Sequence, residues 1–230
     1  MPHAATSRTT SLSSATTLVA RTGAIAALDE GRETLRVGAV SYAPAEREIF
    51  AEGDSADVFF RIVSGTVRTC KFLSDGRRQI EAFYTAGDVF GFELEDARML
   101  SAEAVTDCNL IAYRRKGVEA AALHDETLAR QLLTYAMRSV SHAQKHAFLL
   151  GRRAATEKVA SFLLTWAVRH GRQGHIELPM SRQDMADYMG LTIETVSRTL
   201  SQMERDGLIA IPNARQIQFQ DRQALEDLTI

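Results

Sequence analysis

The chain has 230 residues, of which 45% are hydrophobic and 24% are charged, so it can form two modest globular domains and is neither fibrous nor disordered. No segment has the about 18 consecutive apolar residues of a membrane-spanning helix, and the N-terminus has no signal-peptide pattern, so we expect a cytoplasmic protein without a membrane partner. The formal net charge of -2 gives no indication of nucleic-acid binding, which therefore has to be argued from motif geometry.

The N-terminal part of the sequence changes character near residue 24. Residues 1–23 are rich in Ser, Thr and Ala and have no apolar periodicity, which predicts a mobile tail. Residues 24–122 contain short apolar runs that are separated by Gly-containing turns. The strands predicted from these runs cover residues 48–50, 58–63, 66–73, 79–84 and 102–113. Because closely spaced turns are typical of an all-β barrel or roll, we interpret residues 24–122 as a β-roll domain.

A helical pattern follows, and residues 123–151 are interpreted as a long dimerisation helix. Its apolar residues recur at alternating steps of three and four, as on the seam of a two-stranded coiled coil. The predicted seam consists of Leu133, Ala136, Val140, Ala143, Ala147 and Leu150. A second stripe beside it contains Leu132, Tyr135, Ser139, His142, His146 and Leu149. Two such faces predict that the helix packs on its own roll and on a second copy, in a homodimer; a single core helix in a monomer is the alternative.

Residues 152–230 contain the pattern of a winged helix-turn-helix. A helical pattern covers residues 155–170, and Ser181 is a natural N-cap with Asp184 three residues later. Gly190 supplies a turn, after which Thr192 is expected to cap a second helix. The apolar face of this second helix contains Val196, Leu200 and Met203. Residues 208–219 are expected to form a hairpin, the wing.

The polar face of the second helix has side chains that can read bases. Arg198 can donate to O6 and N7 of one guanine, Glu194 can accept from the N4 amine of a cytosine, and Ser197 can contact a thymine. Other polar residues near the two helices are candidates for phosphate contacts, which set register without reading sequence. These candidates are Ser181, Arg182, Gln183, Thr192, Thr195 and Ser201. The alternative is that Glu194 and Arg198, four residues apart, only form an ion pair on a solvated helix.

Four short motifs are distributed over most of the chain: IFAEGD at 49–54, SGTV at 64–67, AGDVFG at 86–91 and LTIETVSR at 191–198. With these motifs the chain resembles the CRP/FNR family of bacterial transcription regulators, from about residue 35 to its end. The resemblance implies an α+β fold, with an N-terminal cyclic-nucleotide-binding-like β-roll, a long dimerisation helix and a C-terminal winged helix-turn-helix.

Within this family, Glu194, Ser197 and Arg198 resemble the base-reading triad of the FNR type. The CRP type has a second arginine at the position of Ile193 in this chain. The resemblance therefore implies a TTGA half-site, in double-stranded DNA with a palindrome such as TTGAT-N4-ATCAA. It also implies an activator that contacts RNA polymerase.

Departures from the family pattern bear on the signal that is sensed. The first cysteine is Cys70, so the N-terminal cysteine group that holds an iron-sulfur cluster in oxygen-sensing FNR members is missing. Cyclic-AMP binders clamp the phosphate with Gly-Glu and a later Arg-Ser, whereas here Phe92 follows the glycine and Met99 follows Arg98. The chain is therefore identified as a member of the FixK-type subgroup, which serves microaerobic, nitrogen-fixation or denitrification control. The alternative is a regulator gated by a small molecule or haem in its β-roll.

The remaining candidate residues are weighed against simpler roles. Glu93, Glu95 and Asp96 lie in a loop that contacts RNA polymerase by family resemblance; a solvated turn is the alternative. His142 and His146 lie four apart on a helix but have no third metal ligand at suitable spacing.

No cofactor, metal or catalytic site is expected. A cupin metalloenzyme would need clustered histidines on its barrel strands, and residues 24–122 contain no histidine. Two cysteines are too few for a disulfide framework or a four-thiolate metal site. Cys70 is a candidate for redox regulation, with a structural thiol as the alternative.

Overall fold

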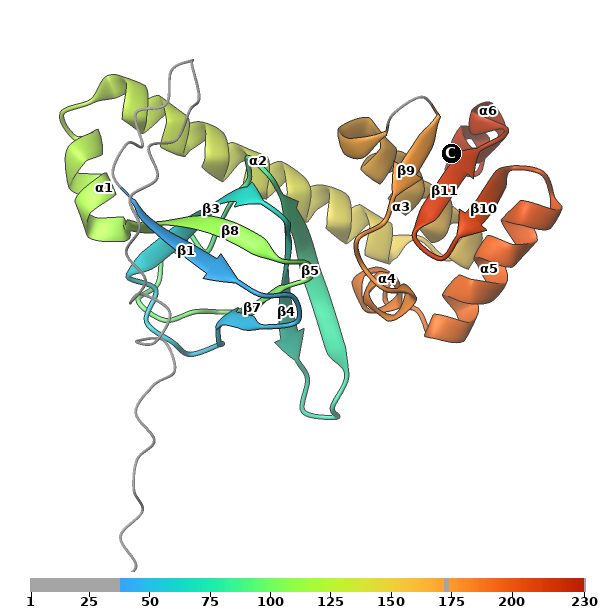
Figure 1. The fold of residues 1–230 in the computed structure, drawn as a ribbon, viewed down its shortest axis with the longest axis horizontal. Coiled ribbons are helices and arrows are strands. Elements are labelled where there is room, and N and C mark those ends of the chain that lie inside the picture. The colour runs from blue at the N-terminus through green and yellow to red at the C-terminus, as the bar shows by residue number, and fades with distance from the viewer. Residues whose placement is uncertain (1–37, 172–173, 230) are drawn as a thin grey trace, which may run out of the picture.

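The computed structural model describes residues 38–171 and 174–229 and has two halves that one long helix connects (Figure 1). The tail predicted at 1–23 and the start of the predicted roll domain lie outside the described residues. The N-terminal half is an antiparallel β-roll. Its strands are β1 (Ala39–Ala43), β2 (Glu48–Phe50), β3 (Val58–Ser64), β4 (Thr66–Phe72), β5 (Arg78–Thr85), β6 (Val89–Phe90), β7 (Ser101–Ala104) and β8 (Cys108–Arg114).

Two four-stranded sheets, β1-β8-β3-β6 and β2-β7-β4-β5, form the roll. Apolar side chains from both sheets meet in its interior, where the ring centroid of Phe60 lies 6.0 Å from that of Phe50 and 5.4 Å from that of Phe90. The tight turn between β3 and β4 requires Gly65, because its φ is +96° and an added Cβ would lie 2.3 Å from the carbonyl oxygen of Asp107. The β-roll predicted from alternating apolar runs is confirmed.

Four of the predicted strands are present, and the fifth was wrong as a single element. The run predicted at 102–113 forms two strands, β7 and β8, which residues 105–107 separate. The chain turns there, and the Asp107 carboxylate accepts a hydrogen bond of 2.9 Å from the backbone N–H of Ala45. Strands β1 and β6 were not predicted; β1 is an edge strand that pairs along its whole length with β8.

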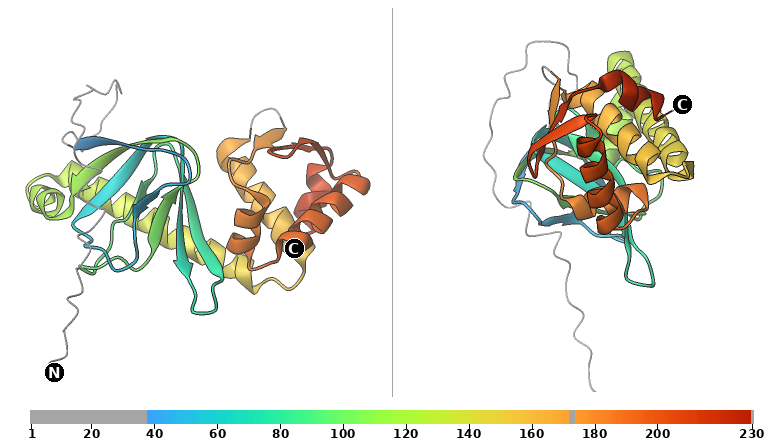
Figure 2. Two further views of the ribbon diagram at one scale, coloured as in Figure 1. Left: turned by 60° about the horizontal axis from the view of Figure 1, so that its bottom comes forward. Right: turned by 90° about the vertical axis from the view of Figure 1, so that its right-hand side faces the viewer.

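Helix α1 (Arg115–Ala122) ends the roll, and α2 (Glu126–Gly151) continues from the roll to the C-terminal half (Figures 1 and 2). The N-cap of α2 is Asp125, whose carboxylate accepts from the backbone N–H of Leu128 at 3.0 Å. Leu128 packs in a small core with Tyr113 of the roll. The start of α2 is therefore fixed to its own roll. Helix α1 was not predicted.

The C-terminal half is a winged helix-turn-helix. Its elements are α3 (Ala155–His170), β9 (His175–Glu177), α4 (Arg182–Met189), α5 (Ile193–Arg205), β10 (Ile209–Asn213), β11 (Gln216–Phe219) and α6 (Arg222–Asp227). The predicted wing is the hairpin of β10 and β11, to which β9 adds a third strand that was not predicted. No helix in the described part of the chain is both long and apolar enough to span a membrane.

The two halves pack directly on each other through β5 and α4. The core of the C-terminal half extends to Ile80 and Phe83 of β5. The Phe83 ring lies 5.5 Å from the Tyr188 ring of α4 and 6.3 Å from the Trp166 ring of α3. From α2, the His146 ring stacks on Tyr188 at 4.1 Å, and its Nε2 lies 2.7 Å from the Tyr188 carbonyl oxygen. The first helix of the helix-turn-helix is thus held by both the roll and α2.

A group of charges, which we call the junction cluster, adds to this contact; it is largely buried except for Glu46, whose side chain is 66% exposed. It consists of Glu46, Arg68, Arg78, Glu103, Asp184 and Asp187. The Arg68 guanidinium on β4 contacts Glu103 at 2.8 Å and Asp184 of α4 at 3.1 Å. Arg78 on β5 contacts Asp184 and lies 2.8 Å from Asp187. Because buried charges are costly unless they are paired, this pairing specifies how α4 sits on the roll.

Candidate nucleic-acid interface

Helix α4, the first helix of the motif, begins with the predicted cap. The Ser181 hydroxyl oxygen accepts from the backbone N–H of Asp184 at 3.0 Å, and the Asp184 carboxylate accepts from the backbone N–H of Ser181 at 3.0 Å. This capping box satisfies two N–H groups that the helix leaves free. Asp184 also belongs to the junction cluster, so one carboxylate fixes both the start of α4 and its place on the roll.

Ser181→Ala is expected to lower the free energy of unfolding by about 1 kcal/mol, because the Asp184 N–H loses its capping acceptor. Chemical denaturation of the purified chain measures this loss. Ser201→Ala is the matched control, since Ser201 is exposed on α5 and caps no helix there; its effect should stay below about 0.5 kcal/mol. Equal stability of the two variants would contradict a stabilising cap.

Helix α5 follows a tight turn and has one buried face. Gly190 has a φ of +63°, in the left-handed region that favours glycine, and links α4 to α5. The Thr192 hydroxyl oxygen caps α5 by accepting from the backbone N–H of Thr195 at 3.2 Å. Val196 and Leu200 are buried in the core of the C-terminal half. The cap, the turn and the apolar face of α5 therefore lie where the sequence predicts them.

The three predicted base-reading residues lie on the opposite, exposed face of α5. Glu194, Ser197 and Arg198 are all exposed, whereas Val196 and Thr199 are buried. Residues three and four apart are neighbours on a helix surface, so the three side chains form one contiguous patch. A helix that is packed on one side and polar on the other can enter a DNA major groove.

Glu194 and Arg198 do not form the ion pair of the alternative interpretation. The structure has i,i+4 ion pairs between Glu126 and Arg130 and between Arg222 and Glu226, but among the described residues Glu194 and Arg198 do not form such a pair. The pKa of Glu194 is held below its usual range by its own backbone N–H, by the Thr192 side chain and by the charge of Arg198. Glu194 is therefore ionised at neutral pH and able to accept hydrogen bonds.

The predicted phosphate contacts are distributed over α4 and α5. Those that are exposed are Ser181, Gln183, Thr192 and Ser201. Thr195 is partly buried, and its hydroxyl lies 3.1 Å from that of Thr192. Arg182 is half-buried, with its guanidinium 3.3 Å from the Met185 sulfur, and burial lowers its pKa. Several of the candidates thus lie at helix starts, where backbone N–H groups favour anions.

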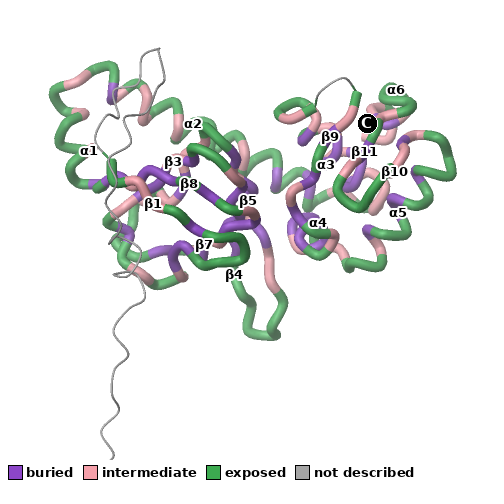
Figure 3. Tube along the Cα trace, viewed as in Figure 1, coloured by how far each residue is buried: buried purple, intermediate pink, exposed green. Residues whose placement is uncertain are grey.

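The predicted seam of α2 is exposed in the single chain, and Figure 3 shows the helix as largely exposed where it leaves the roll. Leu133, Val140 and Leu150 are 62%, 49% and 37% exposed, and the three seam alanines are exposed as well. The neighbouring stripe faces its own chain, since Leu132 and Tyr135 pack against the small core at the base of the roll. A monomer would leave the row of apolar seam residues in water.

A cavity of about 480 Å³, the roll cavity, lies where the β-roll meets α2. Its lining includes the carboxylates of Glu81 and Glu93. Lys71 is the only lysine or arginine among the described residues that line it, and Lys71 pairs with Glu52 at 2.7 Å. The roll cavity therefore provides no free positive charge for the phosphate of a cyclic nucleotide.

Arg98, the arginine of the incomplete phosphate clamp, has a structural role. Its guanidinium is buried 4.0 Å from the centroid of the Phe50 ring. It donates to the carbonyl oxygens of Gly91 and Val58, which tie the loop to the roll. Burial lowers its pKa. Arg98 is thus committed to the protein backbone and does not line the roll cavity.

Only two of the three residues predicted to contact RNA polymerase are exposed in the acidic loop. Glu95 and Asp96 are exposed, and Asp96 pairs with Arg115 at 2.5 Å. Glu93 instead turns inward, where its carboxylate accepts from the backbone N–H of Met99 at 2.8 Å. Glu93 therefore holds the loop in shape, whereas Glu95 and Asp96 face outward.

The candidate redox and metal residues are buried or engaged. Burial, with a contribution from the charge of Glu103, raises the pKa of Cys70 to about 11, so its thiol is protonated at neutral pH and poorly reactive. His146 is bound to Tyr188, and burial lowers the pKa of His142. Within residues 38–171 and 174–229, no three His, Cys, Asp or Glu side chains are grouped as a metal site requires.

The junction cluster is the part of this interface that sequence patterns missed. Its two arginines position α4 but touch no predicted contact face. The available signal was an arginine inside a buried strand, since Arg68 lies between Val67 and Thr69, which are both buried. Such an arginine needs a carboxylate partner, although the sequence does not say which one.

Known proteins share both halves of this architecture. Residues 157–228 match the family model of the Crp-like helix-turn-helix domain, and residues 40–125 match that of the cyclic nucleotide-binding domain. The chain is 44% identical over 211 residues to the nitrogen fixation regulation protein FixK of Azorhizobium caulinodans, covering 88% of this chain and 85% of that protein. It is 40% identical to FixK of Rhizobium meliloti, covering 82% and 85%.

A solved structure agrees with these sequence relatives. FixK2 from Bradyrhizobium japonicum superposes with a TM-score of 0.80 at 43% sequence identity, covering 84% of this chain and 98% of that one. The shared identity extends over roll, long helix and winged helix-turn-helix, so the whole architecture is common to them. The chain therefore belongs to the CRP/FNR family of DNA-binding transcription regulators, among the relatives of the FixK proteins.

Proposed function

We propose that the chain regulates transcription as a homodimer that binds a TTGAT-N4-ATCAA palindrome, with one α5 helix in each half-site. The observation that carries this proposal is the exposed patch of Glu194, Ser197 and Arg198 on a helix whose opposite face is packed. Arg198 reads the guanine of TTGA, and Ser197 contacts a thymine. Glu194 accepts a hydrogen bond from the N4 amine of a cytosine. The six candidate phosphate contacts set the register.

The homodimer in this proposal forms through the exposed seam of α2. Two α2 helices pair in parallel through these seams, whose apolar residues recur at alternating steps of three and four. This parallel pairing places the two α5 helices on one face of the dimer. Two-fold symmetry in the protein then matches two-fold symmetry in the DNA. Residues 24–122 act as the sensor-like roll domain, 123–151 as the dimerisation helix and 152–230 as the DNA-binding domain.

The regulated programme is inferred from the relatives. FixK proteins of two rhizobia are named as nitrogen fixation regulators, and we assign this chain to the same kind of microaerobic, nitrogen-fixation or denitrification control. It acts there as an activator, and Glu95 and Asp96 are its candidate contacts with RNA polymerase, with Glu93 as support for their loop.

Binding of the aerobically purified full chain to a TTGAT-N4-ATCAA duplex tests this function, against a duplex in which both TTGA half-sites are scrambled, at about 0.15 M salt. We expect the palindrome to bind at least about 10³-fold more tightly without any added ligand. Binding that is indifferent to sequence would reject the assigned triad. Specific binding that appears only after a ligand is added would instead support the ligand-gated alternative, for which the roll cavity is the candidate site within the β-roll.

Val140→Glu is expected to weaken dimerisation by about 3 kcal/mol or more, because two carboxylates would meet at one position of the seam. Analytical ultracentrifugation over a dilution series measures the dimer dissociation constant. Val168→Glu is the matched control, since Val168 is 77% exposed on α3 and outside the seam. An unchanged dissociation constant for Val140→Glu would place the dimer interface elsewhere.

A further inference from the structure

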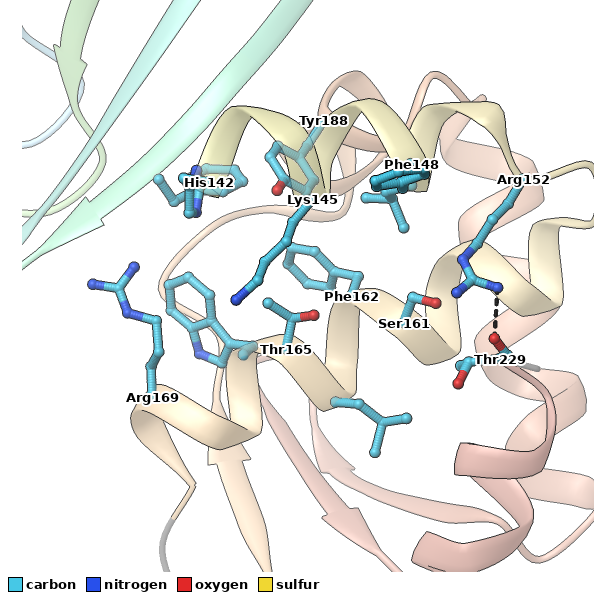
Figure 4. Close-up of a pocket in the computed structure, with 14 residues that line it drawn as sticks. His142, Lys145, Phe148, Arg152, Ser161, Phe162, Thr165, Arg169, Tyr188 and Thr229 are labelled. Atoms are coloured by element: carbon cyan, nitrogen blue, oxygen red, sulfur yellow. Dashed lines mark hydrogen bonds between the residues drawn. The ribbon is translucent and has the colours of Figure 1, made fainter. Parts of the chain in front are cut away.

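A second cavity, of about 310 Å³, lies between α2 and α3, and we call it the hinge cavity (Figure 4). Its walls also include Tyr188 of α4 and Thr229 near the C-terminus, and it shares no lining residue with the roll cavity. Its volume is at the low end of the range for small-molecule sites, which suits a ligand of one or two rings. The hinge cavity thus touches both the long helix and the DNA-binding half.

The lining of the hinge cavity is positively charged. Its described residues include Lys145, Arg152 and Arg169 and no carboxylate. Arg152 donates to the carbonyl oxygen of Thr229 at 2.9 Å, and Arg169 pairs with Asp88, which lies outside this cavity. Lys145 has no hydrogen-bond or ion-pair partner in the described part of the chain, and in Figure 4 it extends from α2 into the cavity. Such a lining attracts an anion.

The rest of the wall is mainly aromatic. The rings of Phe162 and Trp166 lie 6.2 Å apart at an interplanar angle of 20°, and the Tyr188 ring lies 5.6 Å from that of Phe162. Flat rings pack well on such surfaces. Among the described atoms, the Ser161 hydroxyl on the same wall is buried without a hydrogen-bond partner. A planar ligand would therefore find apolar contact on this wall.

The hinge cavity stays open in the proposed dimer. Successive residues of a helix are about 100° apart, so Lys145 lies about 200° around α2 from the seam residues Ala143 and Ala147. His142, the other titratable residue of α2 in the lining, lies on the same side as Lys145, and Arg152 directly follows the end of α2. A second copy on the seam therefore does not cover the cavity.

We propose that the hinge cavity binds a small aromatic carboxylate, with its acid group at Lys145 and its ring against Phe162 and Trp166. The unpaired lysine supplies a charge-assisted contact for the carboxylate. The aromatic wall favours a flat ring over a strongly hydrated inorganic anion. A bound ligand would contact α2, α3 and Tyr188 of α4 at once. It would therefore influence the position of the helix-turn-helix relative to α2. The proposal does not depend on the DNA sequence that is read.

Titration of the full chain with sodium benzoate tests this site, with Trp166, the only tryptophan, as the fluorescent reporter. We expect a saturable change. Cyclohexanecarboxylate keeps the charge but has no aromatic ring, benzamide keeps the ring but has no charge, and inorganic phosphate has only charge. Each of these should bind about 10-fold or more weakly than benzoate. No saturable change with benzoate, or equal affinity for phosphate, would overturn the proposal.

Two variants of α2 locate the binding. Lys145→Gln should weaken benzoate binding about 10-fold or more, because it removes one charge-assisted hydrogen bond. Arg138→Gln is the matched control, since Arg138 is exposed two turns earlier on the same side of α2 and does not line the hinge cavity. It should change the affinity less than about 2-fold. Equal losses in both variants would mean unspecific attraction to a basic surface and would reject the site.

Discussion

Arg198→Ala is expected to weaken binding to the TTGAT-N4-ATCAA duplex by about 2 to 6 kcal/mol, which is about 1 to 3 kcal/mol for each half-site. The guanidinium is exposed on α5 and is not held in an ion pair with Glu194, so it is free to make both hydrogen bonds to one guanine. Its removal leaves two acceptors on that base without a partner. The two half-sites are far apart, so their losses add.

Arg205→Ala is the matched control for this experiment. Arg205 lies on the same helix but in its last turn, where it is exposed and bound to Gln202 at 2.6 Å. Its removal should change specific binding by less than about 1 kcal/mol. Competition with duplexes altered only at the guanine measures the discrimination at that base. If Arg198→Ala weakens all duplexes equally, Arg198 contacts a phosphate, and the assignment of the triad is wrong.

The features that the sequence predicts correctly are those with short-range causes. Ser181 and Thr192 were expected to cap α4 and α5 because each cap is made within three residues, and both are observed. Gly190 was expected at the turn because the backbone there adopts the left-handed conformation, which favours glycine. The exposed apolar face of α2 also follows from helical periodicity, whereas its pairing with a second copy stays a prediction.

The features that the sequence does not predict depend on distant pairs. Arg68 finds its partners 22, 35 and 116 positions away, at Glu46, Glu103 and Asp184, and no local pattern connects them. Asp184 was recognised only as a capping residue, since its second role exists only after α4 has docked on the roll. The short strands β6 and β9 have two and three residues, too few for an alternating pattern to show.

Arg68→Met is expected to lower the free energy of unfolding by about 3 to 5 kcal/mol. Methionine fills similar space, so the loss reports charge and not volume. The variant leaves the buried Asp184 and the partly buried Glu103 in the junction, with only Arg78 as their cation. Replacing a whole buried ion pair by apolar residues can be neutral, but removing only the cation cannot be, because the carboxylates remain. Urea unfolding followed by Trp166 fluorescence measures the loss.

Arg77→Met separates this effect from a general loss of charge on the same hairpin. Its ion pair with Asp75 is exposed, with side chains 76% and 51% accessible, so it should contribute at most about 1 kcal/mol. Equal stability of the two variants would show that the junction cluster does not stabilise the fold.

The same pair of variants tests whether docking of α4 on the roll directs α5. A palindrome is read only when the two recognition helices are about one DNA turn, roughly 34 Å, apart, so a loosened α4 misplaces both of them. Folded Arg68→Met protein should therefore discriminate less between the palindrome and the scrambled duplex, whereas Arg77→Met should discriminate as the wild type does. If Arg68→Met discriminates as well as the wild type, the junction cluster contributes only to stability. The position of α5 would then depend on α2 alone.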